Sequence, residues 1–313
     1  MSPARAVRLA LATFAAASLA PAGGAAEPFT RRTLPFAGGE IELSIEQVSG
    51  ARASPAHVER WVRRAAAAVS GFYGRFPVAR VRVVVRRTPG RGIHGTAFGS
   101  DLVRVRLGVE TAPDRLDSDW VMTHELLHLG FPDLDRRHLW MREGLSTYFE
   151  PIARARVGHM PARQMWHELF RDLPQGMPDD GDGGLDHTRS WGATYWGGAL
   201  FWFLADVEIR ERTRNRRSAD DALRAIRAAG GNASRRWSVQ RVLEVGDRAT
   251  GTDVLGALYR RLALRRFEVD LRALAARLGV RADRFDDRAP LAAIRRSITA
   301  PATAPATGVS RGR

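Results

Sequence analysis

The sequence has 313 residues, 44% of them hydrophobic, and it contains no cysteine. This length and composition suit a globular protein with one large domain or two modest ones. The absence of cysteine excludes disulfides, zinc sites built on thiolates and a lipid-modified N-terminal cysteine, so any metal must be held by nitrogen and oxygen. The net charge is +15, and every one of the 49 basic residues is arginine.

Residues 1–26 have the pattern of an export signal. Arg5 and Arg8 precede the apolar run LALATFAAASLA, and Gly24 and Ala26 suit the minus-three and minus-one positions of a signal-peptidase site. Because the run is too short to span a bilayer, we interpret it as a cleaved secretory signal in preference to an apolar helix packed on the domain. The later apolar stretch GGALFWFLADV contains an aspartate. We therefore expect a soluble, periplasmic or secreted protein without a transmembrane segment.

Residues 27–135 are predicted to form an N-terminal α/β part. Alternation on either side of a Gly-Gly pair predicts a hairpin, and Ser54 followed by Pro55 predicts the start of a helix. Two further stretches alternate with period two and are predicted strands, with the glycine-rich loop PGRGIHGTAFGS between them. The predicted elements are a hairpin over 32–49, a helix over 54–73 and strands over 79–87 and 102–109.

Residues 136–300 are predicted to be almost entirely helical, and strands followed by helices indicate an α+β fold. The segment 172–190 is rich in turn residues and is a candidate rim loop. Residues 301–313 cannot bury a core and are predicted to be disordered. The predicted helices cover roughly 118–130, 137–156, 161–172, 190–212, 218–229, 236–246 and 252–266, with shorter pieces afterwards.

The stretch HELLH has the spacing of a metal site. His124 and His128 are four residues apart, so on a helix they lie on one face and can both reach one ion. Glu125 sits about 100° round the helix from His124, where it can take a proton from water beside the ion. A polar residue among 117–119 can cap such a helix.

A zinc site for hydrolysis also needs a third protein ligand and an open position. The metzincin arrangement is excluded, because Leu134 stands where that class has a third histidine and Phe131 where it has a glycine.

Several other residues compete for the role of third ligand. Asp133 and Asp135 have the character of turn residues, and His138 is expected to be exposed at the start of the next helix. We favour Glu143, because a helix returning from the turn runs antiparallel to the first and brings a residue two turns in back towards His128.

Taken together, HELLH and the following WMREGLSTYFE resemble the gluzincin metallopeptidases, specifically the branch with glycyl aminopeptidases, aminopeptidase N and peptidase-MA-like domains. The second motif of that branch is a Trp, then Glu-Gly, then an aromatic residue. The resemblance implies a thermolysin-like zincin fold, with a small N-terminal mixed sheet and a predominantly helical C-terminal half. It also implies one zinc ion per chain, held by His124, His128 and Glu143, with Glu125 as the general base.

The segment 195–226 is similar to the helical segment that follows in glycyl aminopeptidases, where a tyrosine before a glycine-containing stretch donates to the oxyanion. The resemblance, which covers roughly residues 117–270, gives this role to Tyr195. On the residues alone, Tyr195 is an aromatic residue of a helix face with its hydroxyl in water.

Two features depart from the pattern of the family. Only 14 residues separate His128 from Glu143, which is about one helical turn fewer than in aminopeptidase N or thermolysin. The stretch HGTAFGS takes the place of Gly-x-Met-Glu-Asn, with which aminopeptidases of this branch hold the free amine of the substrate, and no carboxylate precedes Asp101. This difference favours an endopeptidase or an unusual specificity over an aminopeptidase.

Other residues near the motifs receive structural interpretations. Glu150 follows Glu143 by two helical turns and either steadies a ligand or lies in solvent, and Thr147 is a candidate partner of Glu143. His94 and His187 show no ligand spacing but fall in loops that could face the site. Five aromatic residues are predicted to lie in the core: Trp191, Trp196, Phe201, Trp202 and Phe203.

The sequence thus predicts an exported zinc metallopeptidase that hydrolyses a peptide or protein with metal-activated water and a glutamate base. The alternative is an exported basic binding protein that kept a peptidase-like fold and holds an anionic envelope component without hydrolysis. A zinc enzyme that cleaves another amide is a further candidate. The arginines form no basic block, which favours a GC-rich coding bias over a dedicated anionic partner, and no specific nucleic acid is predicted.

Overall fold

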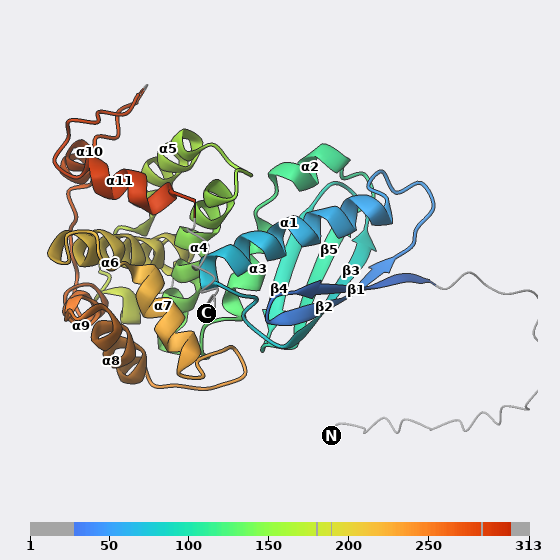
Figure 1. The fold of residues 1–313 in the computed structure, drawn as a ribbon, viewed down its shortest axis with the longest axis horizontal. Helices are drawn as coiled ribbons and strands as arrows, with labels where there is room; N and C mark the ends of the chain where they lie inside the picture. Colours follow the sequence, from blue (N-terminus) through green and yellow to red (C-terminus); the bar gives the residue numbers. More distant parts are fainter. Residues whose placement is uncertain (1–27, 180, 189, 283, 302–313) are drawn as a thin grey trace, which may run out of the picture.

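The computed structural model describes residues 28–179, 181–188, 190–282 and 284–301. A mixed sheet with its helices forms one end of the protein, and a group of helices forms the other (Figure 1). The predicted export signal lies outside the described residues, as does nearly all of the predicted tail. Among the helices of the described residues, none is both long and apolar enough to cross a membrane.

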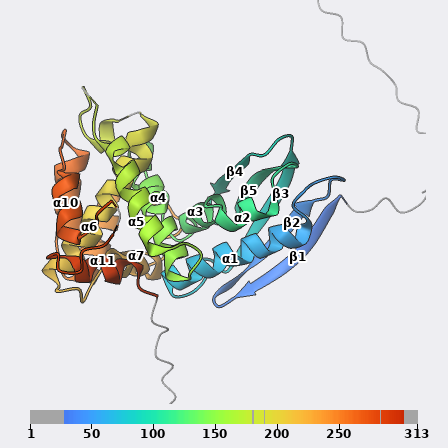
Figure 2. The same ribbon diagram turned by 90° about the horizontal axis from the view of Figure 1, so that it is seen from above.

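The N-terminal part is built on five strands and three helices. Its elements are β1 (Phe29–Phe36), β2 (Gly39–Glu46), α1 (Pro55–Tyr73), β3 (Arg80–Thr88), β4 (Ile93–Phe98), β5 (Leu102–Gly108), α2 (Pro113–Ser118) and α3 (Val121–His128). The strand order is β1-β2-β3-β5-β4, with parallel pairs in the middle and an antiparallel pair at each edge. Alternate side chains of β3, namely Val81, Val83 and Val85, are buried. Helix α1 contacts β1 and β2, and α3 contacts β4, so both helices pack on the sheet (Figure 2).

The predicted hairpin, the helix after it and the two predicted strands are confirmed, but the glycine-rich stretch between those strands is not a loop. Residues 93–98 form β4, which pairs with β5 and is the edge strand of the sheet. Glycine weakens strand propensity, which hides this strand in the sequence. A Cβ atom on Gly95 would lie 2.6 Å from Cγ of Glu125, so the missing side chain lets β4 approach α3.

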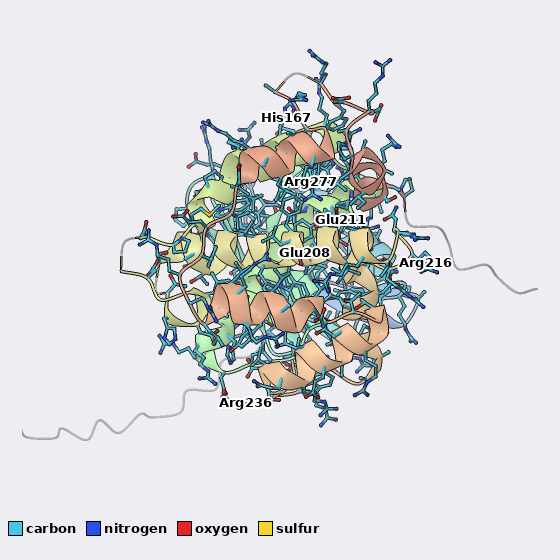
Figure 3. All side chains as sticks on the ribbon, turned by 90° about the vertical axis from the view of Figure 1, so that its left-hand side faces the viewer. His167, Glu208, Glu211, Arg216, Arg236 and Arg277 are labelled. Carbon is cyan, nitrogen blue, oxygen red and sulfur yellow. The ribbon has the colours of Figure 1, made fainter. Side chains whose placement is uncertain are left out.

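The C-terminal part is made of helices and short turns, and its outer face carries charges of both signs, including Glu208, Glu211 and Arg277 (Figure 3). Its elements are η1 (Arg136–His138), α4 (Leu139–Arg156), α5 (Ala162–Asp172), η2 (Leu173–Gly176), η3 (Leu185–His187), η4 (Ala193–Gly197), α6 (Gly198–Arg212), α7 (Ala219–Ala228), α8 (Val239–Thr250), α9 (Val254–Leu258), η5 (Tyr259–Ala263), α10 (Leu271–Leu278) and α11 (Ala292–Thr299). The α+β arrangement predicted from the sequence is confirmed.

Several predicted helices differ from the observed ones, among them the helix predicted over 236–246, which begins and ends later, as α8. The helix predicted over 118–130 is shorter, because the unpredicted α2 precedes it and Asp119 Oδ1 accepts the N–H of Val121 at 2.9 Å, which starts α3 there. The helix predicted over 190–212 begins as a π-helical turn, η4, and the one predicted over 252–266 ends as another, η5.

Helices α4 and α6 meet at a contact between glycines. A Cβ atom on Gly144 would lie 2.0 Å from the carbonyl carbon of Gly198, and one on Gly198 would lie 1.9 Å from the carbonyl oxygen of Trp140. Glycine is therefore required at both positions. The contact places the π-helical turn that precedes α6 beside Glu143.

Candidate metal centre

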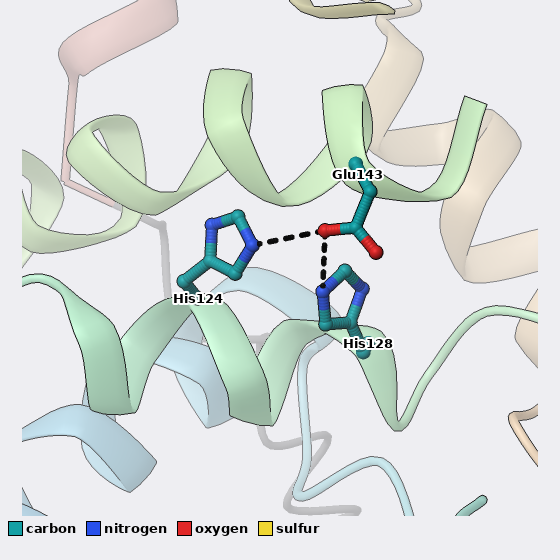
Figure 4. A group of neighbouring side chains, drawn as sticks. All are labelled: His124, His128 and Glu143. Atoms are coloured by element: carbon teal, nitrogen blue, oxygen red, sulfur yellow. Dashed lines mark hydrogen bonds and ion pairs between the residues drawn. The ribbon is translucent and has the colours of Figure 1, made fainter. Parts of the chain in front are cut away.

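Two neighbouring helices bring His124, His128 and Glu143 together. The histidines lie one turn apart on α3, Glu143 lies in the second turn of α4, and all three side chains are buried. Glu143 Oε2 is 3.4 Å from His124 Nε2 and 3.3 Å from His128 Nε2 (Figure 4). Within the part of the chain that the structure describes, these three residues alone form a group with ligand atoms that all lie within 4.8 Å of one another.

The spacing of these atoms fits a tetrahedral zinc ion. Nitrogen and oxygen ligands about 2.0–2.1 Å from such an ion lie about 3.3–3.4 Å from one another. The remaining polar atoms of two of the three residues have other partners: Ser146 Oγ lies 3.1 Å from His128 Nδ1, and Arg142 donates to Glu143 Oε1 at 3.3 Å. Partners of this kind orient ligands towards the metal. Two imidazoles and one carboxylate, with no sulfur, suit zinc.

The protonation states of the group also suit a metal. Burial lowers the pKa of His124, which favours the neutral imidazole. Burial alone would raise the pKa of Glu143, but the charge of His128 and the hydrogen bonds from both histidines outweigh it and hold the pKa well below its usual range. Neutral imidazole and ionised carboxylate are the forms that bind a metal ion.

Glu125 lies on α3 between the two histidines and faces the edge strand. Its Oε2 accepts a hydrogen bond from the backbone N–H of Ala97 at 2.7 Å, which fixes the carboxylate. Burial raises the pKa of Glu125, an effect that the charge of His124 partly offsets. A carboxylate with a raised pKa is a more effective proton carrier near neutral pH.

Tyr195 lies on η4, and its side chain also lies beside the candidate metal ligands. Its ring stacks on that of His124, with ring centroids 6.1 Å apart. Burial, followed by the charges of Glu143 and Glu125, raises the pKa of Tyr195 to about 12, so the hydroxyl keeps its proton at neutral pH. Single π-helical turns inside helices frequently mark functional sites.

Of the aromatic residues predicted to lie in the core, Phe201, Trp202 and Phe203 are fully buried and Trp196 is half-buried. The prediction for Trp191 is wrong, because this side chain is 61% exposed and stacks on Tyr195 with centroids 5.0 Å apart. The helical periodicity of the segment could not show this, because η4 changes the period at that point.

The other candidate ligands lie away from the centre. Asp133 and Asp135 lie in the turn before η1, as predicted, and Asp135 pairs with Arg236 at 2.7 Å. The prediction that His138 is exposed is wrong, because its side chain is buried with Nδ1 2.9 Å from Oδ1 of Asp186.

Sequence reasoning missed the role of Asp186 altogether. This carboxylate also accepts hydrogen bonds from Trp140 Nε1 at 2.8 Å and from the hydroxyl of Tyr259 at 2.5 Å. Asp186 therefore holds the segment 172–190, which the sequence predicts to be a rim loop, against α4 and η5. No local pattern could reveal this, because its partners lie 46 to 73 residues away in the chain.

Two residues near Glu143 have roles other than the predicted ones. Glu150 is buried instead of solvated, and it pairs with Arg154 at 2.9 Å. Thr147 donates to the backbone oxygen of Glu143 at 2.8 Å, so it supports the helix and not the carboxylate.

No protein-family model matches the sequence, and no curated protein matches it. Solved structures are similar in fold. An aminopeptidase N family protein from Idiomarina loihiensis has a TM-score of 0.64 and 14% identity over 80% of this chain and 49% of that chain. An M1 zinc metallopeptidase from Deinococcus radiodurans has a TM-score of 0.52 and 19% identity over 77% and 53% of the two chains.

A mutant of the Deinococcus enzyme bound to a Tyr-Ser-Ala substrate has the same TM-score, identity and coverage. The chain thus spans about half the length of the solved structures that it matches. The resemblance to the gluzincin group is confirmed in the fold, which this chain shares with the M1 zinc metallopeptidases.

Proposed function

We propose that this chain is an exported, zinc-dependent peptidase that hydrolyses peptide bonds. The convergence of His124, His128 and Glu143 on one point, with ligand atoms 3.3 and 3.4 Å apart, carries the proposal. The similarity in fold to zinc metallopeptidases supports it. Export rests on the pattern of residues 1–26 alone.

One zinc ion per chain would be held by these three residues. When bound, zinc supplies a Lewis acid that lowers the pKa of water towards about 7 and polarises a carbonyl group. Glu125 accepts the proton of the attacking water at Oε1, since Oε2 is held by Ala97. It then gives this proton to the leaving nitrogen, so one carboxylate serves as base and then as acid.

Tyr195 donates its hydroxyl proton in a hydrogen bond to the oxyanion that develops as the carbonyl carbon becomes tetrahedral. The raised pKa of Tyr195, about 12, suits a hydrogen-bond donor that keeps its proton. The edge strand β4 positions the substrate, because among the described residues no strand pairs with its outer side and an extended peptide can pair there.

The proposal is tested by incubating the purified protein with a broad library of unmodified peptides and identifying products by mass spectrometry. We expect cleavage that a chelator abolishes and added zinc restores. Glu125→Gln should remove cleavage, whereas Glu208→Gln, a matched change on the outer face of α6, should not. An intact peptide library after prolonged incubation with zinc would contradict the proposal. Salt-sensitive retention on an anionic polymer would then point to the binding-protein alternative.

A further inference from the structure

A cavity of about 390 Å³ opens directly beside the metal centre. His124 and Tyr195 form part of its wall, and other parts come from α2 and the residues between α2 and α3, from the second half of α4, from α5 and from the tryptophans in and before η4. This volume is within the range of pockets that hold a small ligand or one large side chain. Any group seated in the cavity is therefore next to the bond that the metal centre would cleave.

The walls of the cavity are aromatic and apolar. Trp120 and Trp191 stand at its mouth and are 50% and 61% exposed. Trp196 and the buried Met165 and Leu169 line it further in. Such walls suit the methylene stem of a long side chain, and exposed indole rings also attract cations over their faces.

The charged groups of the cavity are mostly acidic. Glu150 and Asp119 are buried in its wall and Glu168 is half-buried, while Arg154 pairs with Glu150 at 2.9 Å. Asp119 and Glu168 lie near enough to Glu150 for their charges to act on it. Three neighbouring carboxylates thus have one ion-pairing arginine between them, in a chain whose net charge is +15.

The other charged residues of the wall do not correct this imbalance. Arg171 is held by Asp172 through contacts of 2.9 and 2.6 Å, so these two charges neutralise each other. Arg115 is exposed to solvent, and its charge acts only as a minor influence on the pKa of Asp119, after burial and the backbone hydrogen bonds of that carboxylate. Of the Asp, Glu and Arg side chains that line the cavity within the described residues, four are acidic and three basic.

We propose that this cavity receives a cationic side chain, arginine or lysine, of the peptide residue next to the bond that is cleaved. The inference rests on the proposed function, because it assigns the cavity to the substrate of that site. The methylene stem of the side chain lies between the indole rings and its charged end reaches Glu150, Asp119 and Glu168. The carboxylates indicate that the side chain is positively charged, and the volume of the cavity indicates its size.

The electrostatics of the wall agree with this assignment. Burial and, to a smaller extent, the charges of Asp119 and Glu168 raise the pKa of Glu150, Arg154 partly offsets them, and the net pKa is about 7. Burial likewise raises the pKa of Asp119 to about 6. These carboxylates are therefore short of positive charge, and a guanidinium or ammonium group in the cavity would supply it.

The test compares peptides that differ at one position, with arginine, or its neutral isostere citrulline, on either side of the cleaved bond. We expect kcat/KM to be at least about tenfold higher for arginine at the one position that enters the cavity. Glu150→Gln and Glu168→Gln should each reduce this ratio. Glu168 is only half-buried and accepts a hydrogen bond from the neutral Gln164, so we expect its variant to fold even if the Glu150 variant does not. Glu208→Gln, which also removes one negative charge, should leave the ratio unchanged.

A binding measurement separates the inference from the proposed function. Saturation-transfer NMR on the same protein compares N-acetylarginine amide with N-acetylcitrulline amide, and it detects ligands with a Kd near 1 mM. We expect a signal for the arginine compound alone, which weakens in Glu168→Gln. Equal cleavage of both peptides, or equal binding of both amides, overturns the cavity inference even if the protein is a peptidase. Selective binding without any hydrolysis supports the cavity and overturns the proposed function.

Discussion

Two buried clusters of histidine and carboxylate lie in the part of the chain that the structure describes, and they differ in how their polar atoms are satisfied. At the first, Glu143 Oε2 faces two imidazole nitrogens at 3.3 and 3.4 Å. At the second, Asp186 accepts three hydrogen bonds of 2.5 to 2.9 Å, from His138, Trp140 and Tyr259. The two clusters use the same residue types.

This difference shows how a set of metal ligands is distinguished from a cluster whose hydrogen bonds only stabilise the fold. The contacts of Asp186 are short and give each of its two oxygens at least one hydrogen-bond donor, so the cluster needs no metal ion to satisfy it. The contacts around Glu143 are at the long limit for hydrogen bonds but equal the ligand separations of a tetrahedral ion. A carboxylate between histidines is therefore a candidate metal ligand when its contacts are long and converge on one point.

The largest expected effect comes from Glu125, which belongs to the first cluster but is no ligand. Changing it to Gln removes the proton acceptor while keeping size and shape. We expect turnover to fall by about 100- to 10,000-fold, the usual contribution of a general base, with zinc content unchanged. Steady-state kinetics and metal analysis of one preparation check this. Loss of zinc together with activity would show that Glu125 acts as a ligand.

The substitution Tyr195→Phe tests the role of the η4 tyrosine beside the first cluster. Removal of one oxyanion donor typically costs about 100- to 1,000-fold in turnover. We expect the fall to appear in kcat more than in KM, because the hydroxyl acts on charge that develops in the transition state. Unchanged turnover in a folded variant would remove Tyr195 from the mechanism and leave it as an aromatic wall residue.

Asp186→Asn perturbs the second cluster. The change replaces one accepting oxygen by an NH₂ group that faces donors, so we expect the free energy of unfolding to fall by about 1–3 kcal/mol. Urea denaturation of the variant and the wild type measures this directly. A variant as stable as the wild type would show that the carboxylate of Asp186 does not stabilise the segment around η3.

The smallest expected effect concerns pH and the cavity beside the first cluster. The pKa of Glu150 is raised from 4.5 to about 7 in the folded protein, so the folded state binds its proton more tightly than the unfolded state does. Its contribution to stability therefore falls as pH rises from about 5 to about 7. Asp119, with a pKa raised to about 6, acts in the same direction, and Arg154 opposes both.

Glu150→Gln should accordingly flatten the fall in Tm between pH 5 and pH 8, by a few degrees at the upper end. Both proteins are measured with a chelator present, so that competition between protons and metal does not contribute. An identical slope in both proteins would contradict the raised pKa.

Much of this arrangement follows from local sequence. The i, i+4 spacing of HELLH sets two imidazoles on one face, and the antiparallel return of the next helix brings Glu143 to them. The alternating valines of β3 predict a strand and the N-cap of α1 predicts the start of a helix, and both elements belong to the N-terminal part. The roles of the site residues remain predictions, although the structure brings them together.

The features that sequence reasoning missed depend on contacts between distant segments. β4 is a strand because it pairs with β5, although Gly95 in its middle and the glycines on either side of it lower the strand propensity of this stretch. His138 is buried because Asp186 returns to it from a separate loop. Trp191 is exposed because a π-helical turn shifts the helical period before α6. None of these partners is encoded in the local pattern of residues.

The most direct test of the account is the zinc content of the purified protein by elemental mass spectrometry, with Glu143→Gln and Asp186→Asn compared as a matched pair. Both variants turn a buried carboxylate beside histidine into an amide. The account predicts one zinc per chain in the wild type and in Asp186→Asn, and a sharp loss in Glu143→Gln. A folded wild type that takes up no added zinc, or zinc that stays in Glu143→Gln and leaves Asp186→Asn, would contradict it.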